Sequence, residues 1–110
     1  MNSQIKDKWI NALRSGKYDQ ARYDLKCDSC RLPNCCIFCV LGVLCDVMSS
    51  SEWIFDKTLN SYFWKERFGS YAAILKNSGL LVEEIMSVID RNDVKHLSFE
   101  KLADYIEVSI

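Results

Sequence analysis

The N-terminal segment alternates apolar and polar residues with the period of an α-helix. Apolar side chains recur at positions i, i+4, i+7 and i+8: Ile5, Trp9, Ala12 and Leu13. This spacing is typical of an amphipathic helix and predicts one over residues 3–14. Ser3 is the expected N-cap, and Gly16 suits the left-handed position beyond the C-terminal end.

The next segments are less regular. Residues 17–26 alternate only partly, which favours an extended segment, and residues 27–34 read as a loop. Residues 35–48 are nearly all apolar, and periodicity alone cannot separate a buried strand from a buried helix there. We expect a short strand near residues 37–38 that passes into a helix over residues 40–48.

Two aromatic runs follow the polar break at residues 49–51. Residues 53–55 and 62–64 are aromatic and β-prone, and residues 56–61 between them have turn chemistry. The pattern predicts a β-hairpin whose aromatic side chains supply cross-strand pairs and much of the core. A short helix is expected over residues 71–76, before the breakers Asn77, Ser78 and Gly79.

The C-terminal third shows two helical stripes. The first contains Val82, Ile85, Met86 and Ile89. The second contains Phe99, Leu102, Ala103, Ile106 and Ile110. They predict a helix over residues 80–90, closed by Asn92 and Asp93, and a last helix capped by Ser98. A short polar turn joins the two into an αα-hairpin.

These elements predict an α+β fold. It has an N-terminal helix, a small antiparallel β-sheet that includes the aromatic hairpin, and a C-terminal αα-hairpin. We expect a single domain over residues 1–110, because the sequence contains no internal repeat, low-complexity tract or long linker.

Composition and charge narrow the function classes. The chain of 110 residues is 49% hydrophobic and carries a net charge of −1, which is typical of a globular domain and not of a disordered one. Residues 1–45 hold seven Lys or Arg against four Asp, a net of +3, and residues 46–110 hold seven bases against eleven acids, a net of −4. An acidic C-terminal half argues against direct nucleic-acid binding and is compatible with binding a basic protein surface.

We expect the chain to be soluble and cytosolic, without a membrane partner. Residues 1–13 lack the apolar core of a secretory signal. The longest apolar run, residues 35–45, is shorter than the roughly 20 residues that a helix needs to span a bilayer. Thiols stay reduced in the cytosol, so the six cysteines are expected to be buried or metal-bound and not paired in disulfides.

The cysteines raise the question of a metal site. Two CxxC pairs, Cys27 with Cys30 and Cys36 with Cys39, could place four thiolates around a tetrahedral zinc ion. The gap between the pairs is much shorter than the roughly 15–20 residues usual in zinc ribbons. The alternative is that Cys35, Cys36, Cys39 and Cys45 are core residues, because unpaired cysteine is among the most buried residue types.

No catalytic constellation stands out in the sequence. His96, the only histidine, lies in the turn before the last helix, and no spacing pairs it with Cys39 or Cys45 as a nucleophile. The four glycines are scattered, so no glycine-rich phosphate loop is present. The acidic pairs Glu83–Glu84 and Asp104–Glu107 are expected on solvated helix faces. We therefore assign no catalytic or cofactor-binding residues.

Three segments resemble a family of small phage and prophage proteins with no assigned activity. They are LRSGKY (13–18) followed by Gln20, FCVLGVLCD (38–46), and SFEKLADYIE (98–107). The family patterns are LRSGKYxQ, YCCLGVLCD and SFxEIADxIE, and Val40 stands where the second Cys of the central pattern is usual. The cluster Cys27, Cys30, Cys35 and Cys36 is not part of these patterns. The resemblance implies a phage origin and the cytoplasm of a bacterial host.

The leading hypothesis is an interaction protein and not an enzyme. It would bind and inhibit a bacterial host protein, such as a nucleic-acid-processing defence complex, in the manner of an anti-CRISPR protein. The alternatives are a small cysteine- or zinc-dependent enzyme and a zinc-stabilised nucleic-acid binder that uses the basic N-terminal segment. The sequence leaves the target, the contact surface and the oligomeric state open.

Overall fold

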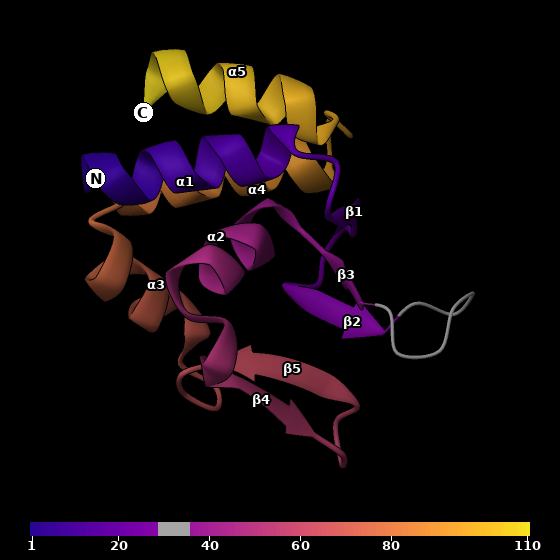
Figure 1. Ribbon diagram of the computed structural model, residues 1–110. Coiled ribbons are helices and arrows are strands. Elements are labelled where there is room, and N and C mark those ends of the chain that lie inside the picture. The colour runs from indigo at the N-terminus through magenta and orange to yellow at the C-terminus, as the bar shows by residue number, and fades with distance from the viewer. Residues whose placement is uncertain (29–35) are drawn as a thin grey trace.

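A computed structural model describes residues 1–28 and 36–110 and confirms the predicted α+β fold (Figure 1). The helices are α1 (Ser3–Arg14), α2 (Val40–Ser49), α3 (Ser70–Ser78), α4 (Val82–Asp93) and α5 (Phe99–Ser109), with a 3₁₀ turn, η1 (Ser50–Glu52). The strands are β1 (Asp19–Gln20), β2 (Lys26–Asp28), β3 (Cys36–Phe38), β4 (Trp53–Asp56) and β5 (Ser61–Trp64).

The strands form two small sheets instead of the one expected. The first has the order β1-β3-β2, with β1 parallel and β2 antiparallel to β3. The second is the predicted aromatic hairpin, in which β4 and β5 pair with Trp53 opposite Trp64 and Phe55 opposite Tyr62. The hairpin lies beside β2, at the opposite end of the molecule from α5 (Figure 1).

Helix α2 lies at the centre of the molecule. Its first six residues are buried, which explains why that stretch is apolar without any periodicity. Trp9 of α1 is fully buried and donates its indole N–H to the Val40 carbonyl oxygen at 2.9 Å. Helix α1 packs on α2 and on α5, so the last helix lies mainly against the first (Figure 1).

Gly42 allows α2 to approach the chain that precedes β2. A Cβ atom at Gly42 would lie 1.7 Å from the carbonyl oxygen of Leu25, far inside any allowed contact. The same Leu25 oxygen accepts a hydrogen bond from the Cys39 N–H at 3.2 Å. The helix and the strand segment are therefore in direct backbone contact, which only glycine permits.

A buried polar network centred on Asn92 joins β1, α2 and α4. Its Oδ1 accepts hydrogen bonds from Gln20 Nε2 at 2.9 Å and from the Val40 N–H at 3.2 Å. Its Nδ2 donates to the Ala21 carbonyl oxygen at 2.9 Å and to Asp93 Oδ1 at 2.7 Å. All of the bonding capacity of this fully buried amide is used, as a buried polar group requires.

Several local predictions are wrong in detail. Asn2, and not Ser3, is the N-cap of α1, with its Oδ1 accepting from the Ile5 N–H. Asn92 and Asp93 do not close the fourth helix but form its last turn. Residues 26–28 form a strand where the sequence favoured the end of an extended segment and a loop. The rest of that predicted loop lies outside the described residues.

Within residues 1–28 and 36–110, no helix combines the length and the apolar character that crossing a membrane requires.

Candidate functional site

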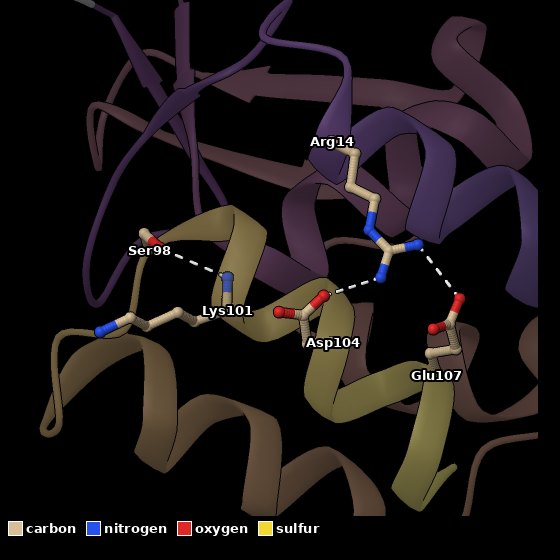
Figure 2. Close-up of polar contacts among 5 residues, drawn as sticks. All are labelled: Arg14, Ser98, Lys101, Asp104 and Glu107. Carbon is tan, nitrogen blue, oxygen red and sulfur yellow. Dashed lines mark hydrogen bonds and ion pairs between the residues drawn. The ribbon is translucent and has the colours of Figure 1, made fainter.

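Arg14, in the first of the resembling segments, contacts two acids in the third. Its guanidinium donates to Asp104 Oδ1 at 2.8 Å and to Glu107 Oε2 at 3.1 Å (Figure 2). The hydrogen bond to Glu107, followed by that to Asp104, raises the pKa of Arg14. Ser98 at the start of the same segment caps α5, with its Oγ accepting from the Lys101 N–H. The two contacts of Arg14 join α1 to α5.

Tyr18 and Asp46 link the first resembling segment to the central one. The Tyr18 hydroxyl donates to Asp46 Oδ2 at 2.6 Å, and Trp53 Nε1 donates to Asp46 Oδ1 at 3.0 Å. Burial, and then the neighbouring Asp46 carboxylate, raises the pKa of Tyr18 above its ordinary value of 10. The polar contacts of Arg14, Tyr18 and Asp46 thus join elements of the fold.

The cysteines singled out in the sequence do not converge among the described residues. Cys27 pairs with Ile37 across the β2–β3 ladder and Cys36 pairs with Asp28, so Cys27 and Cys36 project from opposite faces. Cys36 Sγ lies 3.7 Å from Asp28 Oδ1.

No group of three or more potential metal ligands occurs in the part of the chain that the structure describes. Cys30 and Cys35 lie outside it, so the four-cysteine zinc site stays a prediction.

Cys39 and Cys45 are buried thiols with suppressed acidity. Cys39 is the N-cap of α2, where its Sγ accepts from the Gly42 N–H at 3.4 Å. Burial raises the pKa of Cys39 to about 12 and also raises that of Cys45. Because the thiolate is the nucleophile, neither side chain is suited to cysteine catalysis. His96 lies exposed in the turn after α4, with a positive φ of 56°.

A hollow of about 380 Å³ lies between the β1–β2 connection, β5 and the start of α3. We call it the aromatic pocket; it is lined by residues 23–25, 61–63 and 68–72. Three of its rings lie on the surface, with Tyr23 73%, Phe68 75% and Tyr71 50% exposed. Tyr62 and Phe63 of β5 are half-buried, and the Phe63 and Phe68 rings lie 5.0 Å apart. Contiguous exposed aromatic surface of this kind is typical of a binding site.

Two of the residues with exposed rings have a backbone conformation that is rare for bulky side chains. Tyr23 and Phe68 have φ values of 72° and 62°, in the left-handed region that bulky residues rarely adopt. At Tyr23 the conformation is held by its backbone N–H, which donates to Asp93 Oδ1 at 2.9 Å. Strained backbone that presents an exposed side chain is a feature of functional sites, where surrounding contacts stabilise an unfavourable conformation.

Sequence reasoning missed this pocket. The hairpin rings were expected in the core, and Trp64 is indeed fully buried, but its neighbour Phe63 lines the pocket. Tyr23 belongs to a segment without periodicity, and Phe68 follows the hairpin outside any stripe. The signal available in the sequence was that Tyr23 and Phe68 are aromatic residues that belong to no amphipathic pattern.

The aromatic pocket lies within the part of the chain that matches a known protein family. A family described as a domain of unknown function (DUF8296) matches residues 1–77, which include every residue that lines the aromatic pocket and end before α4 and α5. No curated protein and no solved structure matches the chain.

Proposed function

The chain belongs to the DUF8296 family, and on that premise we propose that it is a phage-derived protein that binds and inhibits a protein of the bacterial host through the aromatic pocket. The observation that carries the proposal is the exposure of Tyr23, Phe68 and Tyr71 around one hollow. Aromatic side chains at the centre of an interface contribute a large part of its binding energy, and leaving three of them in water has no benefit for folding.

The resembling segments support a phage origin through their order and residue types. Their polar members, such as Arg14, Tyr18 and Asp46, hold the fold together. If relatives share such residues, they share a scaffold, and the activity would then reside in surface features such as the aromatic pocket. A defence complex that processes nucleic acids is the target class we propose, and the bacterial cytoplasm is the compartment.

A cysteine-dependent enzyme is the less favoured alternative. The buried thiols of Cys39 and Cys45 have raised pKa values, so an activity of that kind would depend on the cysteines nearer the surface. A zinc-stabilised nucleic-acid binder would show affinity that falls steeply with salt. Neither alternative accounts for the exposed rings of the aromatic pocket.

Phage plating on defended hosts tests the proposal. The chain would be expressed in a panel of bacterial strains that each carry one defence system, and the plating efficiency of a sensitive phage would be measured. We expect plating to be restored on one defence system. The double variant Tyr23→Ser/Phe68→Ser should lose this effect, because it removes two exposed rings while leaving the core intact.

Val108→Ser is the matched control. Val108 is 85% exposed on α5, so the substitution removes a surface apolar side chain that is not part of the aromatic pocket. It should restore plating as the wild type does. An effect that survives in the double variant would exclude the aromatic pocket as the contact surface, and no effect in any defended strain would contradict the defence-system target.

A further inference from the structure

The lining of the aromatic pocket carries a negative charge. Among the described residues that line it, Asp24 is the only one with a charged side chain, and it is exposed. Asp93 lies behind the pocket, where it accepts from the Tyr23 N–H. Burial raises the pKa of Tyr71, and smaller contributions to that shift come in turn from Cys39, Asp93, Cys45 and Asp24.

The positive end of α3 also lines the pocket, but an acid lies beside it. Gly69 at its N-cap makes no side-chain capping hydrogen bond. The Glu66 carboxylate occupies the space where a side chain at Gly69 would be, with Oε2 2.8 Å from the position of a Cβ atom there. A carboxylate at this place offsets the partial positive charge of the helix end. The surroundings therefore favour a cation and not an anion.

Two cations near the pocket, Arg67 and Lys26, already contact other groups. The Arg67 guanidinium lies 5.8 Å from the centre of the Phe68 ring and forms an ion pair with Asp56. The Lys26 ammonium lies 4.7 Å from the Tyr62 ring and also contacts two other aromatic rings, at 5.0 and 5.5 Å. Both show that rings of this region interact with cations. Tyr23, Tyr71 and Asp24 have no such cation among the described contacts.

We propose that the aromatic pocket binds an arginine side chain of the partner protein, stacked on Tyr23 and Tyr71 with its guanidinium facing Asp24. A guanidinium is flat, stacks on aromatic faces and pairs with a carboxylate through two parallel hydrogen bonds. The volume of about 380 Å³ accommodates one such side chain and part of its backbone. This inference rests on the proposed function, because it names the chemistry by which the host protein is recognised.

Nuclear magnetic resonance titration of the full ¹⁵N-labelled chain tests the inference. The probes are N-acetyl-arginine amide and N-acetyl-citrulline amide, which has nearly the same shape but no charge. We expect the arginine probe to shift the amide signals of Tyr23, Tyr71 and Ala72 in a saturable manner, and to bind about fivefold more tightly than the citrulline probe. Asp24→Asn should remove this difference.

Asp7→Asn is the control, because it makes the same change of charge at an exposed position of α1. It should leave the preference for arginine unchanged. Equal binding of both probes, binding only of N-acetyl-phenylalanine amide or of a nucleoside monophosphate, or no shift at the pocket with any probe would each overturn the inference.

The two proposals fail separately. Loss of plating in the Tyr23→Ser/Phe68→Ser variant together with no preference for arginine would remove the arginine inference and keep the proposed function. A preference for arginine that depends on Asp24, together with full plating by the double variant, would keep the site and remove its proposed role.

Discussion

The Tyr18 hydroxyl donates a 2.6 Å hydrogen bond to Asp46, whose other carboxylate oxygen accepts from the Trp53 indole at 3.0 Å. One carboxylate thus holds the segment before β1, helix α2 and the aromatic hairpin together. Tyr18 lies 28 residues before Asp46 in the sequence, whereas Trp53 follows Asp46 by seven residues.

Tyr18→Phe removes one of these two bonds and keeps the ring. A hydrogen bond to a charged group contributes about 1.5–3 kcal/mol, so we expect the free energy of unfolding to fall by about 2 kcal/mol. Urea denaturation followed by tryptophan fluorescence measures it. Tyr105→Phe removes a hydroxyl that bonds only to the neutral Ser87 and should cost less. Equal losses in the two variants would show that the Asp46 contact has no special weight.

Gly42→Ala should reverse the usual effect of alanine in a helix. Alanine normally stabilises a helix interior by about 1 kcal/mol relative to glycine. Here the new methyl group would meet the Leu25 oxygen, so we expect a loss of about 3 kcal/mol or more, or no folding. Gly16→Ala, which meets nothing within 4 Å, should lose only about 1 kcal/mol through its positive φ. A Gly42→Ala protein as stable as the wild type would contradict the close contact.

Glycine in place of Tyr23 or Phe68 should affect the stability of the fold and the binding of the partner differently. In Tyr23→Gly or Phe68→Gly the left-handed backbone becomes favourable, and at position 23 the N–H bond to Asp93 is kept. We expect the free energy of unfolding to stay constant or rise by up to about 1 kcal/mol, while plating activity falls. Lys8→Gly, in the middle of α1, should lose roughly 0.5–1 kcal/mol. Strong destabilisation by both pocket variants would show that the rings serve the core and not a partner.

The buried thiols predict a loss of stability at high pH. Burial raises the pKa of Cys39 from 9.0 to about 12, so the folded chain holds this proton more tightly than the unfolded chain. The contribution of the protonated Cys39 thiol to the free energy of unfolding is complete below about pH 9. It is lost as the pH rises toward 12, by at most about 1.4 kcal/mol per pH unit. Urea midpoints between pH 7 and about pH 10.5 measure it. Cys45→Ala should make the decline shallower, because the pKa of Cys45 is raised too, whereas a midpoint that does not change with pH would contradict the burial.

The sequence predicted those elements that bury one face, because such an element has a regular spacing of apolar residues. The stripes of α1 and α5 and the aromatic hairpin were found because local periodicity reports burial directly. The two-residue strand β1 lies within the extended segment predicted for residues 17–26, but its bounds could not be predicted, because it is held by the distant residues Ile37 and Phe38 and by the Asn92 network. The N-cap of α1 was misplaced by one residue because Asn2 and Ser3 are both good caps.

The candidate site was less accessible to sequence reasoning than the fold. The cysteine spacing suggests a metal site, which stays a prediction because Cys30 lies outside the described residues, but the spacing does not indicate that β2 and β3 direct Cys27 and Cys36 to opposite faces. The aromatic pocket joins Tyr23, Phe63 and Tyr71, which come from three separate segments. Their proximity follows from tertiary packing alone, so no local pattern could indicate it.

Site-specific photo-crosslinking in host cells tests the central claim most directly. Benzoylphenylalanine would replace Phe68 in one variant and Val108 in another, since both side chains are strongly exposed but only Phe68 lines the aromatic pocket. We predict that irradiation joins the chain to one host protein from position 68 and not from position 108. Crosslinking of that protein from position 108 alone, or no crosslink from position 68 in a host where the chain restores plating, would contradict the account.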